Sequence, residues 1–245
     1  MIDLPERTKK PRREGLTCLT DTGLTVVQTR DMLTDFGDYI DVAKFGIGSA
    51  YLTPRLEEKI ALYQDAGIIV YFGGTLFEKF YHQSKLDDYF DYMRNLNVRH
   101  IEVSAGTIDL SLADSLKVVE KCAGEFTCFC EVGTKDKTTV MPPSKWIETM
   151  RAFLEAGAEY VIAEGRDSGT AGIFRPSGEM RTGLISDLIS SIGYEKLIIE
   201  APTHTSQMYL ITEIGPNVNL GNIKPSDVLV LETQRNGLRY ETFHI

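Results

Sequence analysis

The chain has 245 residues, 42% of them hydrophobic, and a formal net charge of -9. At 27.4 kDa it can bury one large core, and no Pro-, Gly- or Ser-rich linker divides it, so we predict a single domain over residues 15–245. The excess of acidic residues argues against a nucleic-acid partner. No apolar run is long enough for a membrane span and no apolar leader opens the chain, which predicts a cytoplasmic protein without a membrane partner.

Residues 1–14 are polar and basic. Lys9, Lys10, Arg12 and Arg13 form a positive cluster that could be an arm for nucleic acid. In a chain with an acidic net charge, a solvated extension is the favoured interpretation, because charge runs of this kind are usually exposed. We therefore predict a polar, basic N-terminal extension and assign no function to it.

Short runs rich in Ile, Val, Phe and Tyr recur along the chain, and segments with helical spacing lie between them. One such segment places Leu56, Ile60 and Tyr63 on the same helical face. The runs that we predict as strands cover residues 16–21, 39–46, 68–74, 100–106, 127–133, 160–166, 197–202 and 218–223. Alternating units of this number and length predict a (β/α)8 TIM barrel, in which reactive groups lie at the carboxyl ends of the strands.

Three of the predicted strands contain a glutamate that is followed by a chain-turning residue. These residues are Glu131, Glu164 and Glu200. Apolar strands normally avoid acids, because an unpaired buried carboxylate is costly or becomes protonated. We expect the three side chains to converge at the barrel mouth on a divalent cation, for which Mg²⁺ is the predicted ion.

Cationic side chains lie near the same strand ends. Lys44 alternates with Val42 on one face of the second strand, where an unpaired ammonium would be costly, so it needs an anion. That anion is either a substrate or an acid on a neighbouring strand. Lys135 follows the fifth strand and Arg166 ends the sixth, and both could instead be surface charges.

Two glycine-containing loops could surround an oxyanion with backbone N–H groups. The first covers residues 165–172 and includes Ser168 and Gly169 beside Arg166, whose guanidinium could bind an anion in bidentate fashion. We expect this loop to be mobile when empty. The second is Gly73 and Gly74 after the third strand, although a Gly-Gly pair there is more often a simple turn.

Cysteine and histidine spacing excludes several chemistries. Cys18, Cys122, Cys128 and Cys130 form no CxxC pair, which predicts buried apolar thiols and no disulfide framework. The four histidines show no zinc-binding spacing. No GxSxG, GxGxxG or Walker sequence is present, so hydrolase, dinucleotide and P-loop interpretations lack their usual support.

Residues 7–243 resemble the phosphosulfolactate synthase family in the order and spacing of several motifs. The most specific are GGTLFE at residues 73–78 and EGRDSG at residues 164–169. The other matching strings are DYIDVAKFG at 38–46, EVG at 131–133, EAGA at 155–158, EAP at 200–202, GPNVNL at 215–220 and LETQRNGLR at 231–239.

The resemblance implies a Mg²⁺-dependent addition of sulfite to phosphoenolpyruvate, giving 2-phospho-3-sulfolactate on one route to coenzyme M. It also implies a homo-oligomer. Sulfite would attack the methylene carbon, and a general acid would protonate C2. The residues assigned on this basis are Lys44, Lys135 and Arg166 for catalysis, Glu131, Glu164 and Glu200 for the metal, and Asp21, Gly73, Gly74, Ser104, Ser168, Gly169, Asn219 and Arg235 for substrate binding.

Some strand-end positions depart from the family pattern. Members commonly have Trp where this chain has Ile47, Asp or Asn in place of Ala105, and Lys in place of His204. A methyl group at position 105 removes a possible hydrogen bond, so substrate preference could differ unless that side chain faces away from the site. Two other functions stay open: a Mg²⁺-dependent aldolase or lyase acting on similar acids, and a non-catalytic, stress-associated role.

Overall fold

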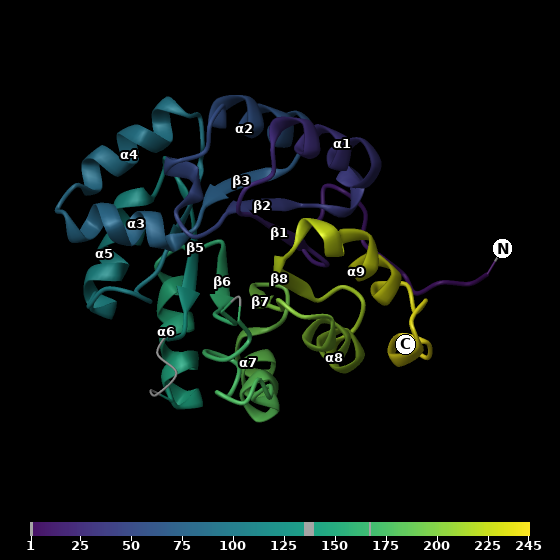
Figure 1. Ribbon diagram of the computed structural model, residues 1–245. Coiled ribbons are helices and arrows are strands. Elements are labelled where there is room, and N and C mark those ends of the chain that lie inside the picture. The colour runs from purple at the N-terminus through teal and green to yellow at the C-terminus, as the bar shows by residue number, and fades with distance from the viewer. Residues whose placement is uncertain (1, 135–139, 167) are drawn as a thin grey trace.

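The computed structural model describes residues 2–134, 140–166 and 168–245 (Figure 1). Eight parallel strands form a closed barrel in the order β1 to β8. The predicted (β/α)8 TIM barrel is therefore confirmed. The strands are β1 (Thr17–Asp21), β2 (Val42–Phe45), β3 (Ile69–Phe72), β4 (His100–Val103), β5 (Thr127–Val132), β6 (Tyr160–Ala163), β7 (Leu197–Glu200) and β8 (Asn219–Ile223).

Helices surround the barrel on its outer side, as Figure 1 shows. The described chain has two helices between β3 and β4, and short 3-10 turns in several loops. The α-helices are α1 (Val26–Phe36), α2 (Leu56–Asp65), α3 (Gly74–His82), α4 (Leu86–Asn95), α5 (Leu112–Cys122), α6 (Pro143–Glu155), α7 (Thr182–Ile192), α8 (His204–Ile214) and α9 (Val228–Arg235). The 3-10 turns are η1 (Gly37–Tyr39), η2 (Ser49–Tyr51), η3 (Pro225–Asp227) and η4 (Tyr240–Thr242).

Local sequence signals explain where several of these elements begin and end. A capping box joins Thr25 and Gln28 at the start of α1. The observed strands are shorter than the predicted runs, since Gly74 already begins α3 and Glu164 follows β6 rather than belonging to it. The chain-turning residues thus lie in the loops, which places the glutamates at the strand ends.

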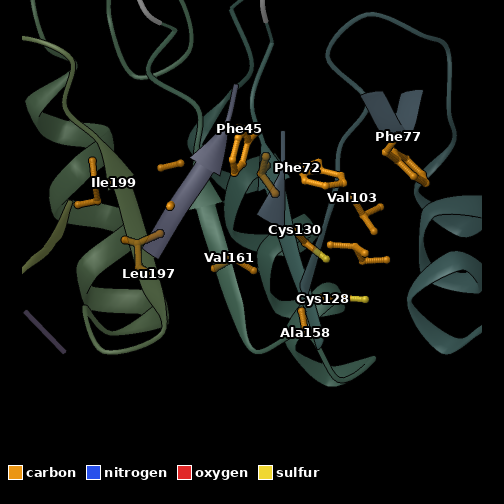
Figure 2. Close-up of a cluster of buried hydrophobic side chains, with 14 of the residues drawn as sticks. Phe45, Phe72, Phe77, Val103, Cys128, Cys130, Ala158, Val161, Leu197 and Ile199 are labelled. Carbon is orange, nitrogen blue, oxygen red and sulfur yellow. The ribbon is translucent and has the colours of Figure 1, made fainter. Parts of the chain in front are cut away.

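Two apolar layers hold the barrel together. The outer layer lies between strands and helices and includes Phe45, Phe72, Cys130 and Leu197 (Figure 2). The inner layer consists of Leu16, Cys18, Val42, Tyr71, Phe129, Tyr160, Ile162 and Ile198. Because successive strand residues face opposite sides, the chain fills the barrel interior with alternate side chains and packs the others against the helices.

The cysteines behave as small apolar groups. All four are buried and free. Cys128 and Cys130 belong to the outer layer (Figure 2), on the face opposite to Glu131. The prediction of buried thiols without a disulfide is confirmed.

The N-terminal segment is not a freely solvated extension. Arg7 Nη1 donates a hydrogen bond to Asn217 Oδ1 at 2.7 Å, and Arg7 Nε lies 3.2 Å from Glu232 Oε1. Arg12 Nε lies 3.4 Å from Asp41 Oδ1, and both side chains are almost fully buried. Asn217 precedes β8 and Asp41 precedes β2, so these arginines fasten the segment to the amino-terminal end of the barrel. This corrects the expectation of a solvated arm for Arg12, whereas Lys9 and Arg13 are exposed as expected.

Candidate active site

Three glutamates converge at the carboxyl end of the barrel. Glu131 comes from β5, Glu164 follows β6 and Glu200 ends β7. Each offers one carboxylate oxygen, and these oxygens lie within 4.8 Å of one another. All three side chains are buried. The structure therefore brings together the three residues that the strand-end pattern singled out.

Glycines let the backbone pass close behind these acids. A Cβ atom at Gly172, where φ is +68°, would lie 2.8 Å from the carbonyl carbon of Glu164. At Gly165 it would lie 2.9 Å from Glu200 Cβ. A side chain at either position would displace the adjacent glutamate, so the glycines of this loop set the position of the carboxylates.

Backbone N–H groups orient two of the carboxylates. The amide of Arg166 donates to Glu164 Oε1 at 2.6 Å. The amide of Gly165 donates to Glu200 Oε2 at 2.9 Å. Such charge-assisted bonds fix which oxygen turns towards the shared volume.

Lys44 points into the same volume. Its ammonium nitrogen lies 2.9 Å from Glu102 Oε2, 3.2 Å from Glu200 Oε1 and 3.6 Å from Glu131 Oε2. Burial by itself lowers the pKa of Lys44, but the neighbouring carboxylates, above all Glu102 and Glu200, outweigh it and hold this pKa well above its ordinary value. The ammonium stays charged at neutral pH.

Glu102 is a site residue that the sequence reasoning missed. It lies inside β4, is 1% exposed, and accepts a hydrogen bond from the Gly74 amide at 2.5 Å. Burial raises the pKa of Glu102 to about 7, although the Lys44 ammonium opposes the shift. The signal was an acid within an apolar strand, but no glycine or proline follows Glu102 within the next three residues, so a search for glutamates before a chain-turning residue passes over it.

The Gly73 and Gly74 turn does not form the predicted anion nest. The Gly73 amide donates to the Phe45 carbonyl at 2.9 Å, and the Gly74 amide donates to Glu102. A Cβ atom at Gly74 would lie 2.7 Å from Glu102 Oε1. These glycines are needed for close approach of the backbone to Glu102 and Lys44, and their amides already have protein acceptors.

Ser104 is also engaged within the protein. Its hydroxyl donates to Glu78 of α3, which accepts further hydrogen bonds from the amides of Gly106 at 2.9 Å and Thr107 at 2.8 Å. Glu78 was not predicted as a site residue. It ties the loop after β4 to α3, so the predicted substrate contact of Ser104 would require this hydroxyl to change partners.

Asp21 faces the helices instead of the barrel mouth. Its carboxylate lies 2.7 Å from Lys59 Nζ and accepts the Tyr63 hydroxyl at 3.0 Å, and both partners belong to α2. In the register of β1 with β2, Thr20 is the partner of the inward-facing Lys44, so the next residue points outward. The predicted substrate contact of Asp21 does not fit this orientation.

Asn219 and Arg235 lie at the opposite end of the barrel. Asn219 begins β8, and its Nδ2 donates to the Tyr194 carbonyl at 3.0 Å. Arg235 is fully buried and donates to the carbonyls of Val218 at 2.8 Å and Leu16 at 3.0 Å. Both residues close the amino-terminal end, which corrects their assignment to substrate binding.

The loop after β6 forms a tight turn at the mouth. Arg166 has a φ of +34°, and its carbonyl accepts the amide of Gly169 at 2.8 Å. Ser168 is exposed, and its hydroxyl lies 2.8 Å from that of Thr170. Arg166 and Gly169 are thus placed at the same end as the acids, whereas the predicted catalytic residue Lys135 lies outside the described residues.

The positions that depart from the family pattern lie around this end. Ile47 is 72% exposed and has a φ of +49°, which is rare for a β-branched residue. Ala105 is exposed beyond β4. His204 Nε2 lies 3.5 Å from Asp227 Oδ1 at the start of α8.

A surface pocket of about 890 Å³ opens beside this end of the barrel. Its surface is mainly apolar and includes Tyr51, Leu76 and Ile108, and polar side chains such as the buried Glu78 also line it. The three converging glutamates do not line it. The acid cluster in the mouth and this hollow are therefore separate features of the barrel.

Buried acids with a lysine at the carboxyl ends of the strands define a TIM-barrel enzyme. The profile of the (2R)-phospho-3-sulfolactate synthase family matches residues 5–241. The phosphosulfolactate synthase of Bacillus subtilis is 42% identical, with 100% of this chain and 98% of that protein covered. That of Methanocaldococcus jannaschii is 38% identical, with 94% of each covered. The chain belongs to the phosphosulfolactate synthase family, a family of C–S bond-forming enzymes.

Solved structures support the fold. A 3-hexulose-6-phosphate synthase aligns with a TM-score of 0.55 at 13% identity, covering 90% of this chain and 98% of that chain. A phosphonopyruvate hydrolase in complex with oxalate and Mg²⁺ aligns with a TM-score of 0.54 at 9% identity, covering 88% and 77%. At such identities the likeness concerns the barrel itself.

Proposed function

We propose that this chain is a Mg²⁺-dependent phosphosulfolactate synthase that adds sulfite to C3 of phosphoenolpyruvate. The observation that carries the proposal is the convergence of Glu131, Glu164 and Glu200 within 4.8 Å, with Lys44 against two of them. The family membership supports the substrates, because the curated relatives are named for the product of this reaction.

The donor set fits Mg²⁺. Carboxylate oxygens are the hard ligands that Mg²⁺ prefers, and three of them lie within 4.8 Å of one another. Ionised Glu102, Glu131, Glu164 and Glu200 bring four negative charges, whereas Lys44 supplies one positive charge. When bound, the ion would supply charge stabilisation for the substrate carboxylate. In the described residues, Glu131, Glu164 and Glu200 would hold it.

The proposed reaction needs protein groups that stabilise negative charge and that donate a proton. The sulfur lone pair of sulfite forms the bond to C3, the C2–C3 π electrons move towards the substrate carboxylate, and C2 then receives a proton. Lys44 is a buried ammonium that can neutralise the developing charge. Its raised pKa makes it a weak proton donor, which favours this ionic role and leaves Lys135 as the alternative general acid. Arg166 would bind the phosphate or sulfite group through its guanidinium.

The metal role is tested by titrating Mg²⁺ into the parent protein and Glu164→Gln by calorimetry. The proposal expects binding to the parent and at least about tenfold weaker binding to the variant, because one charged oxygen ligand is lost. Equal affinity would exclude Glu164 from the metal site. Turnover of phosphoenolpyruvate with sulfite, compared with aldol cleavage of related acids, separates the proposed activity from a lyase or aldolase.

The remaining expectations concern the environment of the enzyme. No helix among the described residues combines the length and the apolar character needed to cross a bilayer. The cytoplasmic location, the homo-oligomeric state and the lack of a nucleic-acid partner stay predictions. Sedimentation analysis of the purified chain checks the second of these.

A further inference from the structure

The Lys44 ammonium lies against carboxylates that a divalent cation would also bind. It lies 3.2 Å from Glu200 and 3.6 Å from Glu131, and both belong to the cluster that would hold Mg²⁺. Two cations on the same carboxylates repel each other strongly at such distances in a buried site. Metal and ammonium therefore compete for these two acids.

Glu102 gives the ammonium another partner. Its Oε2 is the nearest carboxylate oxygen to Lys44 Nζ, at 2.9 Å, and the residue is not a member of the converging cluster. The Gly74 amide holds the other oxygen, Oε1, at 2.5 Å. The backbone thus fixes Glu102 on one side of the ammonium while the metal-binding acids lie on another.

We propose that Lys44 is an internal counter-ion that exchanges with the metal, and that Glu102 is the positioning residue that retains it. Without metal, Lys44 neutralises Glu131 and Glu200. When the ion binds, Lys44 gives up these two acids and stays paired with Glu102, which keeps its charge in the mouth and available to the substrate. This inference rests on the metal of the proposed function.

The pairing with Glu102 also explains why the Lys44 ammonium would stay in the barrel mouth when the metal binds. A lysine with no fixed acid would be expelled towards solvent by the metal, and its charge would be lost from the site. Glu102 prevents this loss of charge because it is itself 1% exposed, and its carboxylate holds the ammonium inside the barrel mouth. The pair therefore preserves a second positive charge beside the metal.

A double-mutant cycle on Mg²⁺ affinity tests the proposal. Calorimetry is performed with Mg²⁺ on the parent, Lys44→Met, Glu102→Gln and the double variant. Lys44→Met should bind Mg²⁺ more tightly, because the competitor is gone. Glu102→Gln should bind about tenfold more weakly, since Lys44 is then held on Glu131 and Glu200, and this loss should shrink to less than about threefold in the Lys44→Met background.

Glu102→Asp separates position from charge and is the safer variant for folding. It keeps the negative charge but withdraws the carboxylate from Lys44, so the proposal expects weaker Mg²⁺ binding here too, and none of this loss when Lys44 is absent. Equal losses with and without Lys44 would mean that Glu102 acts on the metal directly and would overturn the inference while leaving the metal site intact. A parent protein that binds no Mg²⁺ would overturn the proposed metal site, and this inference with it.

Discussion

Lys44 and the acids around it determine the charge of the barrel mouth. The ammonium makes ion pairs with residues of β4, β5 and β7, so one side chain from β2 connects three other strands. An interior network of this kind costs desolvation energy that hydrophobic residues would not. Its position at the end of the barrel where TIM enzymes act favours a catalytic reason for it.

Replacing Lys44 by Met should lower kcat/KM by at least ~100-fold, because the methionine has a similar volume but cannot stabilise charge in the transition state. The measurement is steady-state turnover of phosphoenolpyruvate with sulfite. Lys59→Met is the matched control, since Lys59 is also buried and paired with Asp21 at 2.7 Å, but it belongs to α2 on the outer side of the barrel. That variant should lose stability and keep its kcat/KM. Unchanged turnover in Lys44→Met would make Lys44 a structural ion pair.

The pH dependence of stability should reveal the buried acid Glu102. Burial raises its pKa from the ordinary 4.5 to about 7. Between these values the folded state holds a proton that the unfolded state has released, so the free energy of unfolding falls as the pH rises through this interval. Thermal unfolding of metal-free protein should show this fall, and Glu102→Gln should flatten it. A parent protein that gains stability over the same interval would contradict the assignment.

Residue roles could be predicted from the sequence where strand position decides them, and not elsewhere. Glu131, Glu164 and Glu200 could be predicted because a glycine or proline follows each of them within two residues, near the end of a strand. Asp21 also ends a strand, but its side chain points out of the barrel towards the helices. Only the register of β1 with β2 establishes this direction. Asn219 and Arg235 have polar side chains near strands, yet they lie at the amino-terminal end, because Asn219 begins its strand instead of ending it.

At the scale of elements, the loop after β6 acts as a support for the acids. Its glycines bring the backbone against Glu164 and Glu200, and its amides donate to both carboxylates. The glycine content was visible in the sequence, where it indicated an anion-binding nest. The structure adds that part of this glycine content is required by contacts behind the glutamates, which no local pattern reveals.

Gly172→Ala should therefore damage both stability and metal binding. The methyl group would meet the backbone of Glu164, and φ at this position is +68°. We expect a loss of more than about 2 kcal/mol in the free energy of unfolding together with weaker Mg²⁺ binding, since the carboxylate must move. Chemical denaturation and calorimetry measure the two effects.

Gly124→Ala is the control that measures the cost of the backbone conformation alone. Its φ is +85°, and an added Cβ atom meets nothing within 4 Å. It should cost about 1 kcal/mol from backbone conformation and leave Mg²⁺ affinity unchanged. If both variants behaved alike, the close packing against Glu164 would have no consequence for the site.

At the scale of the whole molecule, the alternation of strand and helix was sufficient to predict the barrel. Eight apolar runs with helical segments between them allow few other closed arrangements. The N-terminal segment escaped the same reasoning because its role depends on distant partners. Arg7 reaches Asn217 and Glu232, and Arg12 reaches Asp41, so a run of charges that is typical of a solvated arm is instead held against the barrel.

The most direct test of the account is the identity of the product. Purified protein is incubated with Mg²⁺, sulfite and ¹³C-labelled phosphoenolpyruvate, and the mixture is followed by ¹³C and ³¹P NMR. The account predicts loss of the vinyl C2 and C3 signals, a new C3 methylene bonded to sulfur and retention of the phosphate ester on C2, all abolished when EDTA removes the metal. Unchanged phosphoenolpyruvate, or release of inorganic phosphate without a C–S bond, would contradict the assignment of this barrel as a phosphosulfolactate synthase.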